Sequence, residues 1–172
     1  MKQLLRFWFG LCVLAAAPQD LSASRTVLLV STGSYLLVSM TLAAMTGGFR
    51  DGAQAALLEL GLLLLFVAGL LYLTGRPARI GQTLAALTGS GSLLGLPAVL
   101  LVAVTGAAAT TGPAAVAWLL LLLWNLLVNA HIMRHALSGS LALGFGVSLV
   151  YMLISTEIIL AGFPQLAAGA AP

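Results

Sequence analysis

Charged side chains are scarce in this sequence. Seven basic and four acidic residues make up only 6% of its 172 residues, whereas 61% are hydrophobic. In soluble domains about a quarter of the residues are charged, and one of this length could not bury so much apolar surface. Lipid can cover that surface instead, so the composition predicts a membrane protein with a single domain. The net charge of +3 is too small for a nucleic-acid-binding surface.

Cysteine and catalytic motifs are also nearly absent. The one cysteine, Cys12, excludes an intramolecular disulfide and a cysteine-rich metal site. The sequence contains no phosphate-binding loop, dinucleotide fingerprint or serine–histidine–aspartate constellation. We therefore expect no enzymatic activity, no cofactor and no nucleic-acid partner. The expected partners are membrane lipids, other membrane proteins or a second copy of the chain.

Five long apolar runs remain, each close to the ~20 residues that a helix needs to cross a bilayer. They cover residues 26–46, 55–74, 82–105, 114–132 and 141–162. Ser22 and Ser24 precede the first run as candidate N-caps. The sequence thus predicts an all-α membrane protein, with a bundle of five transmembrane helices in residues 21–165 and a short tail over residues 166–172.

The basic residues fall almost entirely on one side of this zigzag of runs. Arg50 alone lies on the other side. The residues on the shared side are Lys2, Arg6, Arg25, Arg76, Arg79 and Arg134. Because short loops rich in Lys and Arg stay in the cytoplasm, we predict a cytoplasmic N-terminus and an external C-terminus, the N-in/C-out orientation.

The first 20 residues allow two interpretations. Lys2 and Arg6, a short apolar stretch and three alanines are typical of a cleaved signal peptide. Pro18 follows the alanines directly, however, and cleavage would turn the basic loops outward. We therefore expect residues 1–20 to be retained. They are too few to span, so we predict an interfacial helix with Trp8 near the headgroups. Docking of this helix on the bundle is the alternative.

Two carboxylates fall inside the predicted spans. Glu59 is expected about one turn and Glu157 about one to two turns from the external surface, so they share the outer leaflet by depth. An ionisable group within the membrane is a functional candidate, and the pair is a candidate proton or cation site. Alternatively, each hydrogen-bonds a backbone carbonyl, a threonine or a water near the headgroups. Their shallow depth argues against transport, because coupling sites usually lie near the midplane.

Small residues and one proline predict close helix packing. Gly91 and Gly95 form a GxxxG pair in the third run, a pattern that lets another helix approach closely. Pro97 follows them and predicts a kink. The alternative for this run is a broken helix that lines a substrate path. In the fifth run, Gly146 is expected to pack against a neighbouring helix and to turn Glu157 towards protein.

Two polar pairs lie in the fourth run. Asn125 and Asn129 are four residues apart and share a helix face, so we expect them to hydrogen-bond to neighbouring helices. His131 and His135 have the same spacing, which suits a metal ion. No third ligand is evident beside them, so we expect no metal and assign the histidines to the interface, near the helix C-terminus.

The arrangement of segments resembles the Yip1-like membrane proteins, in particular small bacterial members. The resemblance is carried by residues 18–24 before the first run, by the small-residue run 82–104 with its proline, and by residues 118–137 running into 141–159. It implies a five-span bundle with a cytoplasmic N-terminus in a bacterial inner membrane. The long cytoplasmic region through which eukaryotic relatives bind small GTPases has no counterpart here, and the family has no catalytic residues to transfer.

These observations favour an integral inner-membrane protein without enzymatic activity. We expect it to act through helix–helix or lipid contacts, as a scaffold or a component of a larger complex. The alternative is a small transporter or a proton-coupled permease subunit that uses Glu59 and Glu157.

Overall fold

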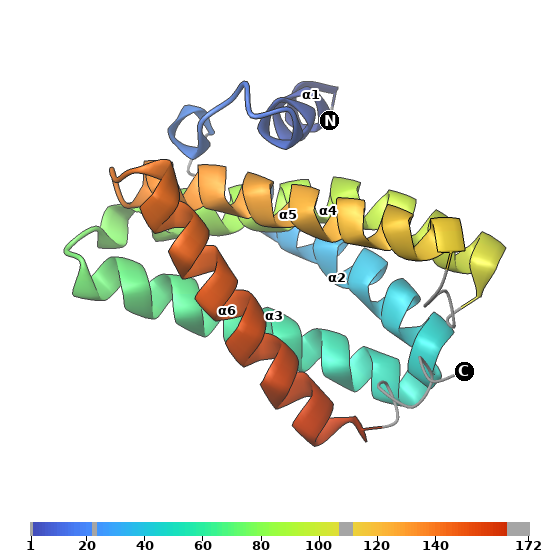
Figure 1. Ribbon diagram of the computed structural model, residues 1–172. Coiled ribbons are helices and arrows are strands. Elements are labelled where there is room, and N and C mark those ends of the chain that lie inside the picture. Colours follow the sequence, from blue (N-terminus) through green and yellow to red (C-terminus); the bar gives the residue numbers. More distant parts are fainter. Residues whose placement is uncertain (1, 22–23, 107–111, 165–172) are drawn as a thin grey trace.

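The computed structural model describes residues 2–21, 24–106 and 112–164. Among these residues the chain forms helices joined by short turns and irregular segments, with no strand. Six α-helices follow one another (Figure 1): α1 (Lys2–Cys12), α2 (Arg25–Gly47), α3 (Phe49–Leu73), α4 (Ile80–Thr105), α5 (Gly112–Ala136) and α6 (Leu141–Gly162). Two short 3-10 helices, η1 (Pro18–Asp20) and η2 (Pro77–Arg79), lie in the connections.

Helices α2 to α6 are each long and apolar enough to cross a membrane. The prediction of five such helices is therefore confirmed. The Ser24 side chain accepts a hydrogen bond from the backbone N–H of Thr26 at 3.3 Å, which caps α2 as expected. Ser22, the other predicted cap, lies outside the described residues. Ser140 caps α6 in the same way, because its hydroxyl accepts from the N–H of Leu143 at 3.2 Å.

The five long helices alternate in direction, and α6 crosses diagonally over α3 (Figure 1). The end of the bundle where α2, α4 and α6 begin and where α3 and α5 finish carries most of the arginines, and we call it the basic end. These arginines are Arg25, Arg76, Arg79 and Arg134. Arg79 also joins two connections there: one of its Nη atoms donates to the carbonyls of His135 and Ala136 at 3.1 and 2.9 Å. A cation at the C-terminus of α5 stabilises the helix dipole.

Helix α3 begins six residues earlier than the apolar run that predicted it. Gly48, with φ of 87°, makes the tight turn from α2 that L-residues with side chains disfavour. Gly52 then lies against the backbone of Ala43 and Ala44 so closely that a Cβ atom would overlap them. The polar residues at the start of α3 are thus helical because they pair with α2. As a consequence, Glu59 is ten residues from the start of α3 and not four, as the apolar run alone indicated.

The GxxxG pair of α4 packs against α2 within the same chain. A Cβ at Gly91 would meet the ring of Tyr35, and one at Gly95 would meet Val38. Beside them, the hydroxyls of Ser34 and Ser92 lie 3.1 Å apart in a hydrogen bond between the two helices. Helix α4 continues unbroken to Thr105, so the alternative of a broken third helix is wrong. Its proline is exposed and lies on the outer side of the bundle.

An apolar core fills the half of the bundle nearest the basic end. Its main members on the spanning helices are Leu63, Val67 and Leu71 of α3, Leu84, Ala86 and Leu87 of α4, and Val128, Ile132 and Met133 of α5. The half nearest the opposite end is packed less fully, and α5 exposes several leucines there, among them Leu119 and Leu123. Lipid can cover these side chains. The core therefore ends near mid-depth, where the polar residues described below begin.

Helix α1 docks on α4 and α5, and Trp8 is buried in that contact. Trp8 is only 4% exposed, because its indole fits against Gly89 of α4, where any side chain would collide with it. The N–H of Trp124 donates to the Cys12 carbonyl at 3.0 Å, and His131 hydrogen-bonds the Ala16 carbonyl at 2.9 Å. Figure 1 shows α1 across the middle of this face. Of the two interpretations of this segment, the geometry agrees with docking.

Docking also predicts an inert thiol. Burial raises the pKa of Cys12 to about 11, and only the thiolate is nucleophilic. The charged form appears as pH rises through that value, so at pH 7 N-ethylmaleimide is expected to leave Cys12 unmodified. Gly89→Leu displaces Trp8 and is expected to make labelling at least ~10-fold faster, as followed by mass spectrometry. Gly61→Leu, at a position with no neighbour within 4 Å, is the matched control. Rapid labelling of the wild-type chain would contradict the docking.

Candidate functional site

The carboxylate of Glu59 is held by two tyrosines from two other helices. The Tyr35 hydroxyl of α2 donates to Oε2 of Glu59 at 2.7 Å. The Tyr151 hydroxyl of α6 donates to Oε1 at 3.0 Å. Each carboxylate oxygen thus receives one hydrogen bond, and bonds to a charged group are the strong ones. The Tyr151 ring packs against Phe66, with ring centroids 5.1 Å apart, and this contact helps to fix its position.

All three side chains lie near mid-depth. Tyr35 is ten residues after Arg25 in a 23-residue helix, and Tyr151 is ten residues after Leu141 in a 22-residue helix. Glu59 is ten residues into the 25-residue α3, which places it about 15 Å from the start of that helix. Measured along the helices, Glu59 therefore lies near the middle of the bundle, because α3 extends beyond its apolar run.

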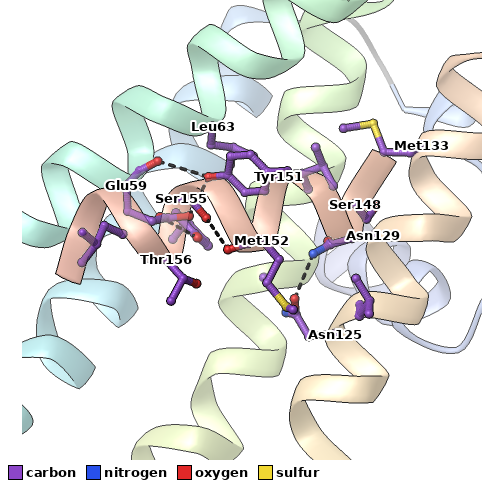
Figure 2. Close-up of a pocket in the computed structure, with 15 residues that line it drawn as sticks. Glu59, Leu63, Asn125, Asn129, Met133, Ser148, Tyr151, Met152, Ser155 and Thr156 are labelled. Atoms are coloured by element: carbon purple, nitrogen blue, oxygen red, sulfur yellow. Dashed lines mark hydrogen bonds between the residues drawn. The ribbon is translucent and has the colours of Figure 1, made fainter. Parts of the chain in front are cut away.

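Glu59 borders a cavity of about 260 Å³ between the spanning helices. All five of them contribute to its lining, and Figure 2 shows the polar side chains that face it. The polar lining consists of Tyr35, Glu59, Asn125, Asn129, Ser148, Tyr151, Ser155 and Thr156. Six apolar side chains line it as well: Leu63, Leu87, Leu126, Met133, Met152 and Ile159. Gly91 completes the wall, so the close α2–α4 packing shapes this space too.

The part of the cavity away from Glu59 offers amide and hydroxyl groups. Asn129 donates from Nδ2 to Oδ1 of Asn125 at 2.9 Å, along one helix. The expected bonds from these asparagines to neighbouring helices are not found among the described residues. Ser148 is 4% exposed, and its hydroxyl is buried without a hydrogen-bond partner. A buried hydroxyl without a partner is costly, and this one belongs to the cavity wall (Figure 2).

No basic side chain lines the cavity in the part of the chain that the structure describes. A buried carboxylate must be compensated, because an ionised group in an apolar surrounding costs far more than a hydrogen bond returns. The two tyrosines supply hydrogen bonds to Glu59 but no positive charge. The site can therefore hold a proton on Glu59, or a cation beside it.

The cavity follows α6 for a considerable distance. The α6 residues in its wall run from Ser148 to Ile159, which corresponds to about 16 Å along the helix. Thr156 is in the wall and is also exposed. The space around Glu59 is therefore not sealed at this edge.

The structure does not bring the two predicted carboxylates together. Glu157 is exposed and does not line the cavity. The α6 wall includes Tyr151 and Ser155, and Glu157 comes two residues after Ser155, about 200° further round the helix. The candidate site thus contains Glu59 alone, with tyrosines in the place where a second carboxylate was considered.

The remaining predicted residues lie elsewhere. Gly146 has open space around it, so the expected close packing at this position is wrong; Gly144 is the glycine at the α5–α6 contact. The rings of His131 and His135 lie edge to face at 4.8 Å, but no group of metal-ligating side chains is found over the described ranges. His131 instead holds the segment that follows α1.

Tyr35 and Tyr151 are the site residues that the sequence interpretation missed. The available signal was their position, since each tyrosine lies near the middle of an apolar run and not at a membrane interface, where tyrosine is common.

Comparisons with models of protein families, with curated proteins and with solved structures find no match to this chain.

Proposed function

We propose that this protein is a small transporter or a proton-coupled permease subunit, and that Glu59 is the group that takes up and releases the proton. The observation that carries the proposal is a single carboxylate at mid-depth, hydrogen-bonded by Tyr35 and Tyr151 and bordering a polar cavity. Coupling sites of transporters typically lie near the bilayer midplane. Intramembrane carboxylates that face a cavity are typical of proton relays.

The scaffold interpretation has less support. The small-residue surface at Gly91 and Gly95 was one argument for it, and that surface contacts Tyr35 and Val38 of the same chain. A scaffold also has no need of an uncompensated carboxylate inside the bundle, which is a cost to stability. The Yip1-like resemblance and the absence of enzymatic activity stay predictions.

The proposed setting is a bacterial inner membrane with the N-in/C-out orientation, in which the basic end faces the cytoplasm. Alkaline phosphatase fused after Pro172 is then expected to be active, because it folds outside the cytoplasm. The same reporter inserted after Gly139, between α5 and α6, is expected to be inactive. A reporter that is active after Gly139 and inactive after Pro172 would contradict the orientation. It would leave the proposed role of Glu59 unaffected.

Proton flux tests the proposed function directly. The purified protein is reconstituted into vesicles that contain the pH dye pyranine, and the outside is acidified. The internal pH is expected to fall faster than in protein-free vesicles. Glu59→Gln, which keeps the shape of the side chain but cannot ionise, is expected to reduce the rate to that of protein-free vesicles. Glu157→Gln is the matched control, because Glu157 is exposed and outside the cavity. Equal rates for Glu59→Gln and the wild type would refute the proposal.

A further inference from the structure

The chemistry of the cavity restricts the chemical class of ligand that would bind there in addition to the proton. We infer that the cavity binds a small monovalent organic cation, a protonated alkylamine with a short apolar chain, in exchange for the proton on Glu59. This inference rests on the proposed function, since it names the substrate class of the same site. It is carried by three observations: the sign of the charge, the mixed lining and the unpartnered Ser148.

The sign of the charge excludes anions and disfavours neutral solutes. Glu59 is the sole charged side chain that lines the cavity among the described residues. An anion would bring a second negative charge into the same low-dielectric space. A neutral ligand would leave an ionised Glu59 without a counter-charge, whereas a cation within a few ångströms of the carboxylate removes that cost.

The lining distinguishes an amine from a metal ion. A bare ion requires oxygen ligands on all sides, but the wall includes four branched aliphatic side chains and the thioethers of Met133 and Met152. The volume of about 260 Å³ also exceeds the needs of one ion. It equals the liquid volume of about nine waters, which suits a molecule of a few to about ten non-hydrogen atoms. An alkylamine presents a cationic head to Glu59 and an apolar chain to the leucines and methionines.

The hydroxyl of Ser148 is an independent indication that the cavity binds a ligand. Its hydroxyl is buried, has no partner within the described part of the chain, and belongs to the same wall as Glu59. An ammonium group has three N–H donors. Glu59 accepts one or two of these, and a water in the remaining space can link the third to the free hydroxyl of Ser148.

Exchange with the proton follows from competition for one carboxylate. A proton on Glu59 removes the charge that attracts the amine, and a bound ammonium group excludes the proton, so each cation displaces the other from the carboxylate. The titratable groups that face Glu59 from the packed helices are Tyr35 of α2 and Tyr151 of α6. Helix α4 has no titratable side chain, and the titratable residues of α5, namely His131, Arg134 and His135, lie outside the cavity lining.

Thermal stabilisation of the purified full-length protein in detergent tests the ligand class. The probes are n-butylammonium chloride, sodium butyrate, butyramide and sodium chloride at equal ionic strength and pH 8. We expect n-butylammonium to raise the unfolding temperature by about 3–5 °C at a concentration tenfold above its Kd. The other three probes are expected to give no shift. At pH 5 the shift by n-butylammonium is expected to shrink, because a thousandfold higher proton concentration competes with the amine for Glu59.

Substitutions in the cavity test whether the shift in unfolding temperature depends on ligand binding there. Glu59→Gln is expected to abolish it, and Ser148→Ala is expected to weaken binding about fivefold, the equivalent of one hydrogen bond. Glu157→Gln should respond as the wild type does. The pH comparison needs no substitution, so it keeps the test valid if Glu59→Gln does not fold.

The outcomes separate the two proposals. A shift by butyrate, butyramide or sodium alone equal to that of n-butylammonium overturns the amine assignment. No shift by any cation, together with a proton flux that Glu59→Gln abolishes, overturns the ligand class and leaves the proposed function standing. A shift by n-butylammonium without Glu59-dependent flux keeps the ligand class and overturns transport.

Discussion

Gly144→Leu is expected to lower the unfolding temperature by about 10 °C. Gly144 lies where α6 crosses α5, and a Cβ atom there would be 2.8 Å from the backbone nitrogen of Arg134 and closer still to the carbonyl oxygen of Ala130. Backbone atoms cannot rotate away as a flexible side chain can, so the two helices must separate. Overpacking of this kind costs on the order of 3 kcal/mol, and each kcal/mol corresponds to about 2–4 °C for a chain of this size.

Gly146→Leu is the matched control. It makes the same substitution two residues further along α6, at a position with no atom within 4 Å. Leucine is also a better helix former than glycine by roughly 0.5–1 kcal/mol. Its unfolding temperature, measured by circular dichroism in detergent, is therefore expected to equal or slightly exceed that of the wild type. A similar loss in both variants would contradict the α5–α6 contact. If Gly144→Leu does not fold, Gly144→Ala should show a smaller loss of the same sign.

Removal of both tyrosine hydroxyls at the candidate site is expected to abolish Glu59-dependent proton flux. Tyr35 and Tyr151 each donate one hydrogen bond to the carboxylate, and bonds to charged groups contribute about 1.5–3 kcal/mol each. In the double variant Tyr35→Phe, Tyr151→Phe, the charged form of Glu59 loses both hydrogen bonds. The charged carboxylate is then no longer accessible during a transport cycle. Each single variant is expected to reduce the flux by about 10- to 100-fold, because 1.4 kcal/mol corresponds to a factor of ten.

Tyr72→Phe controls for the loss of a tyrosine hydroxyl as such. Tyr72 lies on the same helix as Glu59, is 73% exposed and does not line the cavity, so its flux should match that of the wild type. Phenylalanine retains the ring that fills each site, and the double variant is therefore expected to fold. Wild-type flux in the folded double variant would show that the tyrosines do not support the charge on Glu59.

The positions of the five long helices could be predicted because a span is decided locally. About 20 consecutive apolar residues form a helix in lipid whatever their neighbours are, since every backbone polar group is satisfied within the helix. The start of α3 could not be read in this way. Residues 49–54, which include Arg50, Asp51 and Gln54, are helical because Gly52 fits against the backbone of α2. As a result, Glu59 is ten residues into α3, whereas the apolar run alone would place it four residues from the start of the helix.

The glycines also separate what is local in the sequence from what depends on tertiary packing. The GxxxG pattern of Gly91 and Gly95 correctly marked a close approach between helices, since a small surface is a local property. Which helix uses that surface is not local, and the structure assigns it to α2 of the same chain. Likewise, Gly144 and Gly146 lie about 200° apart round α6, and only the face that α6 turns to α5 decides that Gly144 contacts α5 while Gly146 is open.

The sequence alone therefore determined that this is an all-helical chain with five membrane-length helices, and that Glu59 and Glu157 are the carboxylates to examine. Only the tertiary structure decided which of them belongs to a site. Glu59 meets Tyr35 and Tyr151, which lie 24 and 92 residues away along the chain, whereas Glu157 is exposed. Hydrophobicity sets where each helix lies along the membrane normal. The faces that the helices turn to one another depend on packing of residues far apart in sequence, and that packing forms the cavity.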